Sequence, residues 1–346
     1  MPHGACAMHH FDRENLVRLL LLLFVELSSP PEGIKMILLR TLVSCAFFVF
    51  AAPCQAQSSR YDDNVAIAYP TRDEQSKAML EHGKVTPADI ASDPAVLASS
   101  VLVIDQTSGA VLFEKNADYS QPIASITKLM TAMVVLKAAQ SLDQMLQVTT
   151  ADAVASRPTH SRLKVGAKLS RGELLRLMLM ASENRAAAAL ARSFPGGLPR
   201  FVQRMNETAN ALGLRSTHFA DPSGLHPANE STARDLVALV QHAYSFDVIR
   251  AYSTTPEYAV SLRRARTTLF HNTNRLTRSG DWAIGLSKTG FISASGQCLV
   301  LQAAVAGRPL VMVILDSWGK GGRIDDAVRL RSWLEQRNQR FIVARS

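Results

Sequence analysis

Three short motifs in the sequence contain the residue types that nucleophilic catalysis needs. Ser125–Ile–Thr–Lys128 places a hydroxyl and an amine three residues apart, and residues with this spacing lie on one face of a helix. Ser182–Glu–Asn184 supplies a second hydroxyl and an amide, and Lys288–Thr–Gly290 supplies a second amine beside a hydroxyl and a glycine. The set predicts a site in which a serine hydroxyl attacks a carbonyl carbon while an unprotonated lysine amine takes its proton.

The order and context of the motifs select the nucleophile. The Ser-x-x-Lys pattern is weak alone, because it also occurs at Ser161–Lys164 and Ser317–Lys320. Ser-x-Asn and Lys-Thr-Gly each occur once, and only the pattern at Ser125 precedes both of them and opens an apolar helical stretch. We therefore assign Ser125 as the nucleophile, in preference to a solvated serine and lysine on a surface helix.

Lys128 is the candidate general base, and this role requires a lowered pKa. Free lysine has a pKa of about 10.4, so a pKa of about 7 requires roughly 4–5 kcal/mol of destabilisation of the charged form. Burial and the second cation, Lys288, would both act in this direction. The backbone N–H groups of Ser125 and Phe291 are the candidates for an oxyanion hole.

The remaining motif residues are candidates for substrate handling. Ser182 would pass a proton to the leaving amine, and Asn184 would hold the substrate backbone. Lys288 and Thr289 would bind a substrate carboxylate, and Gly290 would let the substrate backbone approach closely. The ordinary alternatives are a polar kink between two helices for the second motif and a lysine that protects a sheet edge for the third.

Other kinds of site are less well supported. The histidines have no Gly-x-Ser-x-Gly motif to accompany them, so a Ser-His-Asp triad is disfavoured. No His-Glu-x-x-His motif or cysteine cluster predicts a metal site, and no glycine-rich loop predicts a bound cofactor. Basic residues are not clustered with interleaved aromatic residues, which argues against nucleic acid as a partner.

The first part of the chain is typical of an exported protein. Residues 1–56 contain a basic residue, the short apolar run Thr41–Ala52 and a small residue, Ala56, after which we predict signal cleavage. The run is shorter than the roughly 20 residues that span a bilayer. Met36 stands where such a signal normally begins, so residues 1–35 are interpreted as an over-long gene start or a discarded part of the signal.

Cysteine content and charge agree with a periplasmic protein. Cleavage would leave only Cys298, for which a buried structural thiol is predicted and no disulfide is possible. A lipid anchor on Cys54 is the alternative, which the preceding proline disfavours. Apolar residues make up 47% of the chain, enough for a folded core, and the net charge of +9 suits a carboxylate-rich polymer, although many soluble proteins are basic without a specific reason.

The hydrophobic pattern predicts strands at both ends of a domain with helices between them. Residues 57–95 are interpreted as an N-terminal extension and residues 96–346 as the catalytic domain, with a helical lobe at about 141–250. Trp282, Ile284, Leu286 and Lys288 alternate and are expected on one strand face. The expected strands are Val101–Asp105, Ala110–Glu114, Trp282–Lys288, Cys298–Val305 and Leu310–Leu315, with a turn at Gly307–Pro309. One helix is expected to begin near Ser125. Further helices are expected over Leu174–Ala191, Leu198–Leu212 and Ser231–Tyr244, and a last one from Asp325 or Asp326 to Leu334.

These motifs resemble the low-molecular-weight penicillin-binding proteins, and most closely the small D-alanyl-D-alanine endopeptidases. The similar segments, spread over residues 95–340, are Pro122–Met133, Ser182–Ala186, Asp221–Leu225, Ser231–Leu236 and Lys288–Gly290. The resemblance implies the α/β (α+β) fold of β-lactamases and DD-peptidases, an antiparallel sheet flanked by helices plus an all-helical lobe. It also implies peptidoglycan stem peptides as substrates and β-lactam antibiotics as covalent inhibitors that acylate Ser125.

The branch of the family is inferred from the part of the chain after the third motif. The larger carboxypeptidases append a β-rich domain and an amphipathic anchor, whereas two strands and a helix account for the residues after Gly290 here. This favours an endopeptidase that cleaves D-alanyl–meso-diaminopimelyl cross-links. The sequence does not determine the oligomeric state, for which a monomer is the expectation. The alternatives are a DD-carboxypeptidase, a β-lactamase and a silent wall-binding protein. A β-lactamase needs a deacylating Glu followed by Leu-Asn, which Glu207–Thr–Ala–Asn210 lacks.

Overall fold

The computed structural model describes residues 93–157, 159–263, 266–319 and 321–343. The chain divides into two units after Gly83, and every described residue belongs to the second unit. The predicted signal segment, residues 1–56, and most of the predicted extension, residues 57–95, lie outside the described residues. Within the described ranges, no helix combines the length and the apolar character needed to cross a membrane.

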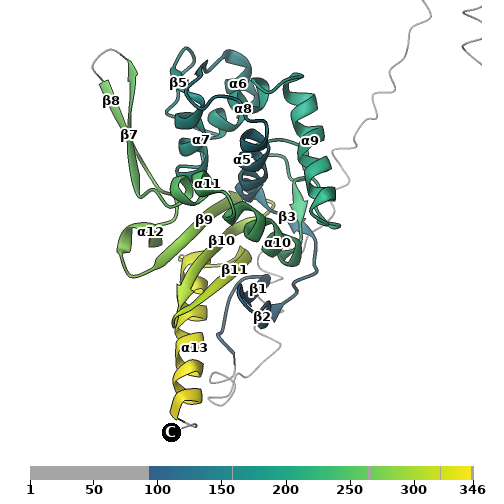
Figure 1. Ribbon diagram of the computed structural model, residues 1–346, viewed down its shortest axis with the longest axis vertical. Coiled ribbons are helices and arrows are strands. Elements are labelled where there is room, and N and C mark those ends of the chain that lie inside the picture. Colours follow the sequence, from purple (N-terminus) through teal and green to yellow (C-terminus); the bar gives the residue numbers. More distant parts are fainter. Residues whose placement is uncertain (1–92, 158, 264–265, 320, 344–346) are drawn as a thin grey trace, which may run out of the picture. The chain divides into compact units, whose positions relative to one another are not determined.

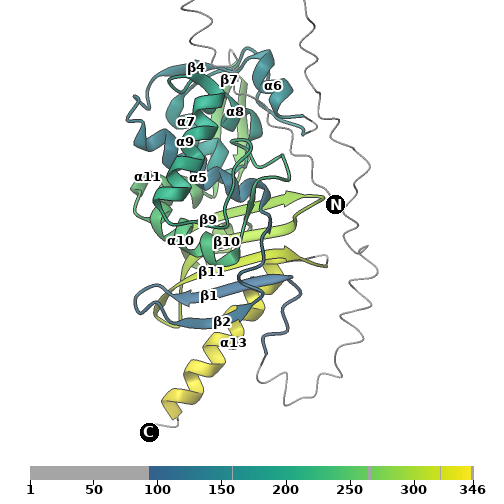
Figure 2. The same ribbon diagram turned by 90° about the vertical axis from the view of Figure 1, so that its right-hand side faces the viewer.

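A five-stranded antiparallel sheet, in the order β2-β1-β11-β10-β9, forms the centre of this unit (Figure 2). Segments from both ends of the domain meet in it, because β1 pairs with β11. The predicted turn begins one residue early: Ala306 and Gly307, with φ of 51° and 76°, form a two-residue turn, and Arg308 already belongs to a strand. The strands are β1 Ser100–Asp105, β2 Val111–Lys115, β9 Ala283–Ile292, β10 Gly296–Val305 and β11 Arg308–Ser317.

The two faces of the sheet pack against different helices (Figure 1). One face packs on α13 (Arg323–Val343), through side chains such as Leu301 and Met312. The other face, which carries Val300 and Val313, packs toward α10 (Ala233–Tyr244). Because both faces are covered, β10 and β11 are nearly continuous apolar runs, as the sequence pattern indicated. The last helix extends to Val343, beyond the predicted end at Leu334.

One predicted strand face is wrong, because β9 contains a bulge at Gly285. Leu286 pairs with Gln302 and Ile284 pairs with Ala303, so two steps along β9 match one step along β10. Ile284 and Trp282 therefore pack on the α13 side, whereas Leu286 faces the other core. A Cβ atom at Gly285 would lie 2.2 Å from the Gln302 side-chain oxygen and 2.7 Å from the Tyr244 ring, so a larger residue at the bulge would displace these side chains.

The helical segment between β2 and β9 contains one unexpected break. The predicted helix over Leu174–Ala191 is divided into α7 and α8, because Ser182 has a φ of 58° in the left-handed region, where a helix cannot continue. The helices predicted at 198–212 and 231–244 are confirmed as α9 and α10, the latter capped by Thr232. The helices are α5 Lys128–Lys137, α6 Thr150–Ala155, α7 Arg171–Met180, α8 Asn184–Arg192, α9 Gly197–Ala211, α11 Asp247–Ser253 and α12 Leu276–Ser279, with a 3₁₀ turn, η1, at Ala124–Thr127.

Three small antiparallel pairs accompany these helices. The first two pairs join distant parts of the helical segment, and the third, β7–β8, is a long hairpin that projects beside α7 (Figure 1). The pairs are β3 Gln121–Pro122 with β6 Glu230–Ser231, β4 Met145–Gln147 with β5 Lys168–Ser170, and β7 Glu257–Arg263 with β8 Arg266–His271.

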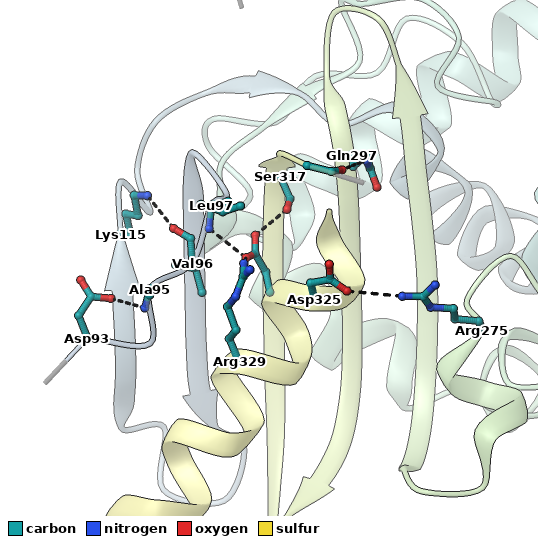
Figure 3. Close-up of polar contacts among 12 residues, drawn as sticks. Asp93, Ala95, Val96, Leu97, Lys115, Arg275, Gln297, Ser317, Asp325 and Arg329 are labelled. Carbon is teal, nitrogen blue, oxygen red and sulfur yellow. Dashed lines mark hydrogen bonds and ion pairs between the residues drawn. The ribbon is translucent and has the colours of Figure 1, made fainter. Parts of the chain in front are cut away.

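A buried carboxylate at the start of α13 connects three parts of the chain. Asp326 is fully buried and accepts hydrogen bonds from the Leu97 N–H at 2.9 Å, the Ser317 hydroxyl at 2.5 Å and the Arg329 guanidinium at 2.9 Å. Figure 3 shows these three donors around the first turn of α13. The beginning of the described chain, the end of β11 and the final helix are thereby held together.

We expect Asp326→Ala to lower the free energy of unfolding by about 3 kcal/mol, because it leaves the buried Ser317 hydroxyl and the partly buried Leu97 N–H without their acceptor. Urea denaturation measures this change. Asp325→Ala is the matched control, since Asp325 pairs with Arg275 at 3.5 Å and both side chains are largely exposed, 47% and 62%. The control should change stability by less than about 1 kcal/mol. Equal losses in the two variants would contradict the role given to Asp326.

Candidate active site

The structure brings the three sequence motifs together between the edge strand β9 and the helices. Ser125 lies in η1 and Lys128 begins α5, while Ser182 and Asn184 flank the break between α7 and α8. The third motif lies within β9, which packs against η1. Two groups of hydrogen bonds result: one centres on the amine of Lys128, and the other on the amine of Lys288.

The Lys128 amine has three oxygen neighbours, and only one of them has a hydrogen to give. Its Nζ atom lies 2.7 Å from Ser125 Oγ, 2.7 Å from Asn184 Oδ1 and 2.5 Å from the Ser223 carbonyl oxygen. Carbonyl and amide oxygens only accept hydrogen bonds. When the amine is neutral, its two N–H groups are therefore used by Asn184 and Ser223. Its lone pair is then left to accept the hydroxyl proton of Ser125.

A short relay of hydrogen bonds fixes which end of the Asn184 amide faces Lys128. The Asn184 Nδ2 group donates to Thr159 Oγ1 at 3.0 Å, and the Thr159 hydroxyl donates to the Ser156 carbonyl. Because the Thr159 hydroxyl hydrogen is already donated to Ser156, the Thr159 oxygen can only accept, and it accepts from the Asn184 amide nitrogen. The Asn184 amide oxygen therefore faces Lys128. The second motif thus orients the amine of the first.

Burial gives Lys128 an unusual protonation equilibrium. The side chain is fully buried, which lowers the pKa of its amine to about 7, while the negative charges of Asp221 and Glu183 act in the opposite direction. Burial is the main cause of this shift, and the contribution expected from Lys288 is not among its causes. Burial of the amine thus gives Lys128 the pKa of about 7 that a general base was expected to need.

The second group of contacts connects Ser182 with β9. The Lys288 amine donates to Ser182 Oγ at 3.0 Å and to the Thr289 carbonyl at 2.7 Å. Burial, followed by the positive charges of Lys128 and Arg323, holds the pKa of Lys288 well below its usual range. The Thr289 hydroxyl lies 2.6 Å from that of Thr273, in the segment that follows β8. Lys288 is therefore a buried member of the site, and it does not protect an exposed sheet edge.

Gly290 is required for a close contact within the protein. A Cβ atom there would lie 2.9 Å from the Ile123 carbonyl oxygen and 3.2 Å from Ala124 Cβ, so glycine lets β9 pack against the segment that precedes Ser125. The side chain of the next residue, Phe291, is 62% exposed. The sequence analysis considered only the approach of a substrate.

Arg323, at the start of α13, is a member of the site that the sequence did not indicate. Its Nη1 group donates to the Gly290 carbonyl at 2.9 Å, and its Nε group is buried without a hydrogen-bond partner. Burial also lowers the pKa of this guanidinium. No local motif could have connected a residue so far along the chain with the third motif.

The loop 221–229 is the second feature that the motifs missed. The Asp221 carboxylate accepts hydrogen bonds from the backbone N–H groups of Ser223, Gly224 and His226, at 2.6, 2.7 and 2.7 Å, and from Asn229 Nδ2 at 2.8 Å. These bonds hold the Ser223 carbonyl against Lys128. Burial alone would raise the pKa of Asp221, but the hydrogen bonds lower it overall. The Asp-Pro-Ser-Gly sequence is typical of a turn closed by an aspartate side chain, which was the available signal.

The rival residues have other contacts. The Ser161 hydroxyl donates to Glu183 Oε2 at 2.6 Å, and the Ser317 hydroxyl donates to Asp326, so each of these serines is bonded to a buried carboxylate. Glu207 lies on α9 and forms ion pairs with Arg200 and Arg204. Cys298 is buried and burial raises the pKa of its thiol to about 11, as expected for a structural cysteine.

Comparisons with known proteins agree with this geometry. Residues 87–319 match the protein family described as D-alanyl-D-alanine carboxypeptidase. A D-alanyl-D-alanine endopeptidase of Pseudomonas aeruginosa is 46% identical over 237 residues, which cover 68% of this chain and 76% of that protein. A D-alanyl-D-alanine endopeptidase of Escherichia coli K12 is 41% identical over 253 residues, which cover 73% and 82% of the two chains.

Solved structures confirm the expected fold. The Streptomyces K15 DD-transpeptidase has a TM-score of 0.64 and 28% sequence identity, over 70% of this chain and 98% of that one. A D-alanyl-D-alanine carboxypeptidase of Mycobacterium tuberculosis gives a TM-score of 0.62 and 30% identity, over 69% and 91% of the two chains.

Asp221→Asn should lower the pKa of Lys128 below about 7, because it removes a negative charge that favours the ammonium form while the amine stays buried. A carbon-13 NMR titration of the lysine Cε signals measures this pKa, and the Lys128 signal is assigned by its absence from Lys128→Arg. Asp247→Asn is the control, since Asp247 is exposed on α11 and pairs with Arg250. An unchanged or higher pKa in Asp221→Asn would contradict the electrostatic account.

Proposed function

The chain belongs to the D-alanyl-D-alanine carboxypeptidase family of serine peptidases, and we propose that it is an endopeptidase that hydrolyses D-alanyl–meso-diaminopimelyl cross-links in peptidoglycan. The observation that carries the proposal is the 2.7 Å contact between Ser125 Oγ and the buried Lys128 amine, whose other two partners are acceptors only. The endopeptidase assignment follows the two relatives at 46% and 41% identity, because the named carboxypeptidases among the relatives are 32% identical or less.

In the first half of the proposed reaction, Ser125 Oγ attacks the carbonyl carbon of the D-alanine and its proton passes to Lys128 Nζ. The backbone N–H groups of Ser125 and Phe291 are proposed to stabilise the negative oxygen of the tetrahedral intermediate. The carbon–nitrogen bond then breaks, and the leaving amine must receive a proton. Ser182 can donate it, with its own proton restored from Lys288, which lies 3.0 Å away.

In the second half, water attacks the acyl ester on Ser125. Between the two halves, the proton that Lys128 gained leaves to solvent and Lys288 regains a proton from solvent, so that Lys128 is neutral again. Lys128 then takes a proton from the attacking water and passes it to Ser125 as the D-alanyl acid leaves. Asn184 has two parts in this scheme: its side-chain oxygen orients the Lys128 amine, as the 2.7 Å contact supports, and we propose that the residue also borders the bound peptide.

Substrate recognition is proposed to use the positive charge along β9. Lys288 and Arg323 lie on either side of the Thr289–Gly290 segment, to which both donate hydrogen bonds. A substrate carboxylate placed there would accept from the Thr289 hydroxyl. It would also return the pKa of Lys288 toward its usual range, because an opposite charge favours the ammonium form. β-Lactam antibiotics are proposed to enter the same site and acylate Ser125.

The proposed location is the periplasm, reached through a signal that is cleaved after Ala56. This part of the proposal depends on the sequence pattern of residues 1–56, which lie outside the described residues. The substrate supports it, because peptidoglycan lies outside the cytoplasmic membrane. We propose that the exported chain acts as a monomer.

Digestion of purified muropeptides by the exported form of the protein, with products identified by mass, tests the proposed function. We expect cross-linked dimers to be converted to monomers, and expect penicillin and Ser125→Ala each to abolish the conversion. Release of only a terminal alanine from pentapeptides would make the protein a carboxypeptidase. Equal conversion by Ser125→Ala would exclude Ser125 as the nucleophile.

A further inference from the structure

A cleft of about 690 Å³ lies between the loop that precedes β5 and the β7–β8 hairpin. In Figure 1 the hairpin stands beside α7 and β5, on the β9 side of the helical segment. The volume is within the usual range of ligand sites. Among the lining residues that the structure describes, two are cationic and none is acidic. The lining residues are Arg162, Lys164, Val165, Gly166, Ala167, Leu262, Thr267 and Thr268.

Arg162 is held in place by the hairpin opposite. Its Nη1 group donates to the Leu269 carbonyl at 2.7 Å, and its guanidinium lies 4.0 Å from the centre of the Phe270 ring, which is fully buried. Among the described residues, these are its only side-chain hydrogen bond and ring contact. The guanidinium is therefore pre-positioned at the cleft with most of its N–H groups uncommitted within the described chain.

Lys164 supplies the second charge of the cleft. It is exposed, and its amine has no hydrogen bond or ion pair with any described residue. Glu183 is a carboxylate of the described chain that interacts electrostatically with Arg162. It is buried, accepts a hydrogen bond from the Ser161 hydroxyl, and has a pKa raised by burial. The cleft consequently keeps a positive field that suits an anionic ligand.

Both walls of the cleft are connected to the active site. On one side, Ser161 bonds to Glu183, the residue between Ser182 and Asn184, and the Leu163 carbonyl accepts from Arg185 at 2.7 Å. On the other side, β8 leads directly to Thr273, whose hydroxyl contacts that of Thr289. The loop that precedes β5 thus contacts the second motif, and the segment that follows the β7–β8 hairpin contacts the third.

We propose that this cleft is an anion subsite for the second stem peptide of a cross-linked substrate, with Arg162 and Lys164 binding a free carboxylate of that peptide. The proposal rests on the proposed function and names a determinant of its specificity. Only a cross-linked substrate has a leaving group large enough to reach the cleft, because a pentapeptide releases a single alanine. Arginine suits the ligand because its planar guanidinium can bind a carboxylate through two parallel hydrogen bonds.

Binding of a purified cross-linked muropeptide dimer to Ser125→Ala, measured by calorimetry, tests this subsite without turnover. Adding Lys164→Glu should raise Kd about tenfold, since a close charged contact is replaced by repulsion. Adding Lys168→Glu instead should leave Kd unchanged: this exposed β5 lysine gives the same change in net charge and does not line the cleft. Unfolding midpoints of the three proteins should agree.

Chemistry on the ligand side completes the test. A dimer whose free carboxylates are amidated should bind Ser125→Ala at least tenfold more weakly, since it loses the contacts proposed at Thr289 as well as those in the cleft, and Lys164→Glu should then have no further effect. An unchanged Kd for the native dimer in Lys164→Glu, or equal losses in Lys164→Glu and Lys168→Glu, would overturn the subsite. Failure of the proposed function would appear separately, as intact dimers in digests by the native enzyme.

Discussion

The buried amine of Lys128 is the interaction on which the other features of the site depend. An ammonium group enclosed in protein loses its hydration, so its proton is bound less tightly than in water. The acceptor-only oxygens of Asn184 and Ser223 then decide where the lone pair of the neutral amine points, which is at Ser125. In the proposed reaction the site therefore needs no base other than Lys128, provided that these two oxygens stay in place.

Much of the surrounding structure serves to hold those two oxygens and the backbone near them. Asp221 organises the loop that carries the Ser223 carbonyl, and Thr159 fixes the amide of Asn184. Ala124 and Ser182 are two of the seven non-glycine residues in the described chain with a positive φ, and their φ values are 46° and 58°. Each costs roughly 1–3 kcal/mol and persists only where packing imposes it. Their positions, just before the nucleophile and at the second motif, indicate that the fold maintains local strain to aim the reactive groups.

The sequence predicted the elements and motifs well, because their signals are local. Period-two and helical patterns predicted the sheet strands, α9 and α10, and the order of the motifs selected Ser125 among three Ser-x-x-Lys patterns. The failures depend on tertiary contacts. The bulge at Gly285 is set by packing against Gln302 and Tyr244, and the left-handed Ser182 interrupts a stretch of strong helix-forming residues. The backbone carbonyl of Ser223 is invisible to a search by side-chain type, and Arg323 reaches the site only through the packing of α13.

The pH dependence of the second-order rate constant for penicillin acylation, read from the mass of the acyl-enzyme, tests the central claim most directly. Only the neutral Lys128 amine can accept the Ser125 proton, and the neutral fraction grows as pH rises through its pKa. The account predicts a rate that increases with pH through about 7 and then levels off, and a loss of about 10²–10⁴-fold in Lys128→Ala. A rate that is constant across pH 7, or undiminished in Lys128→Ala, would contradict it.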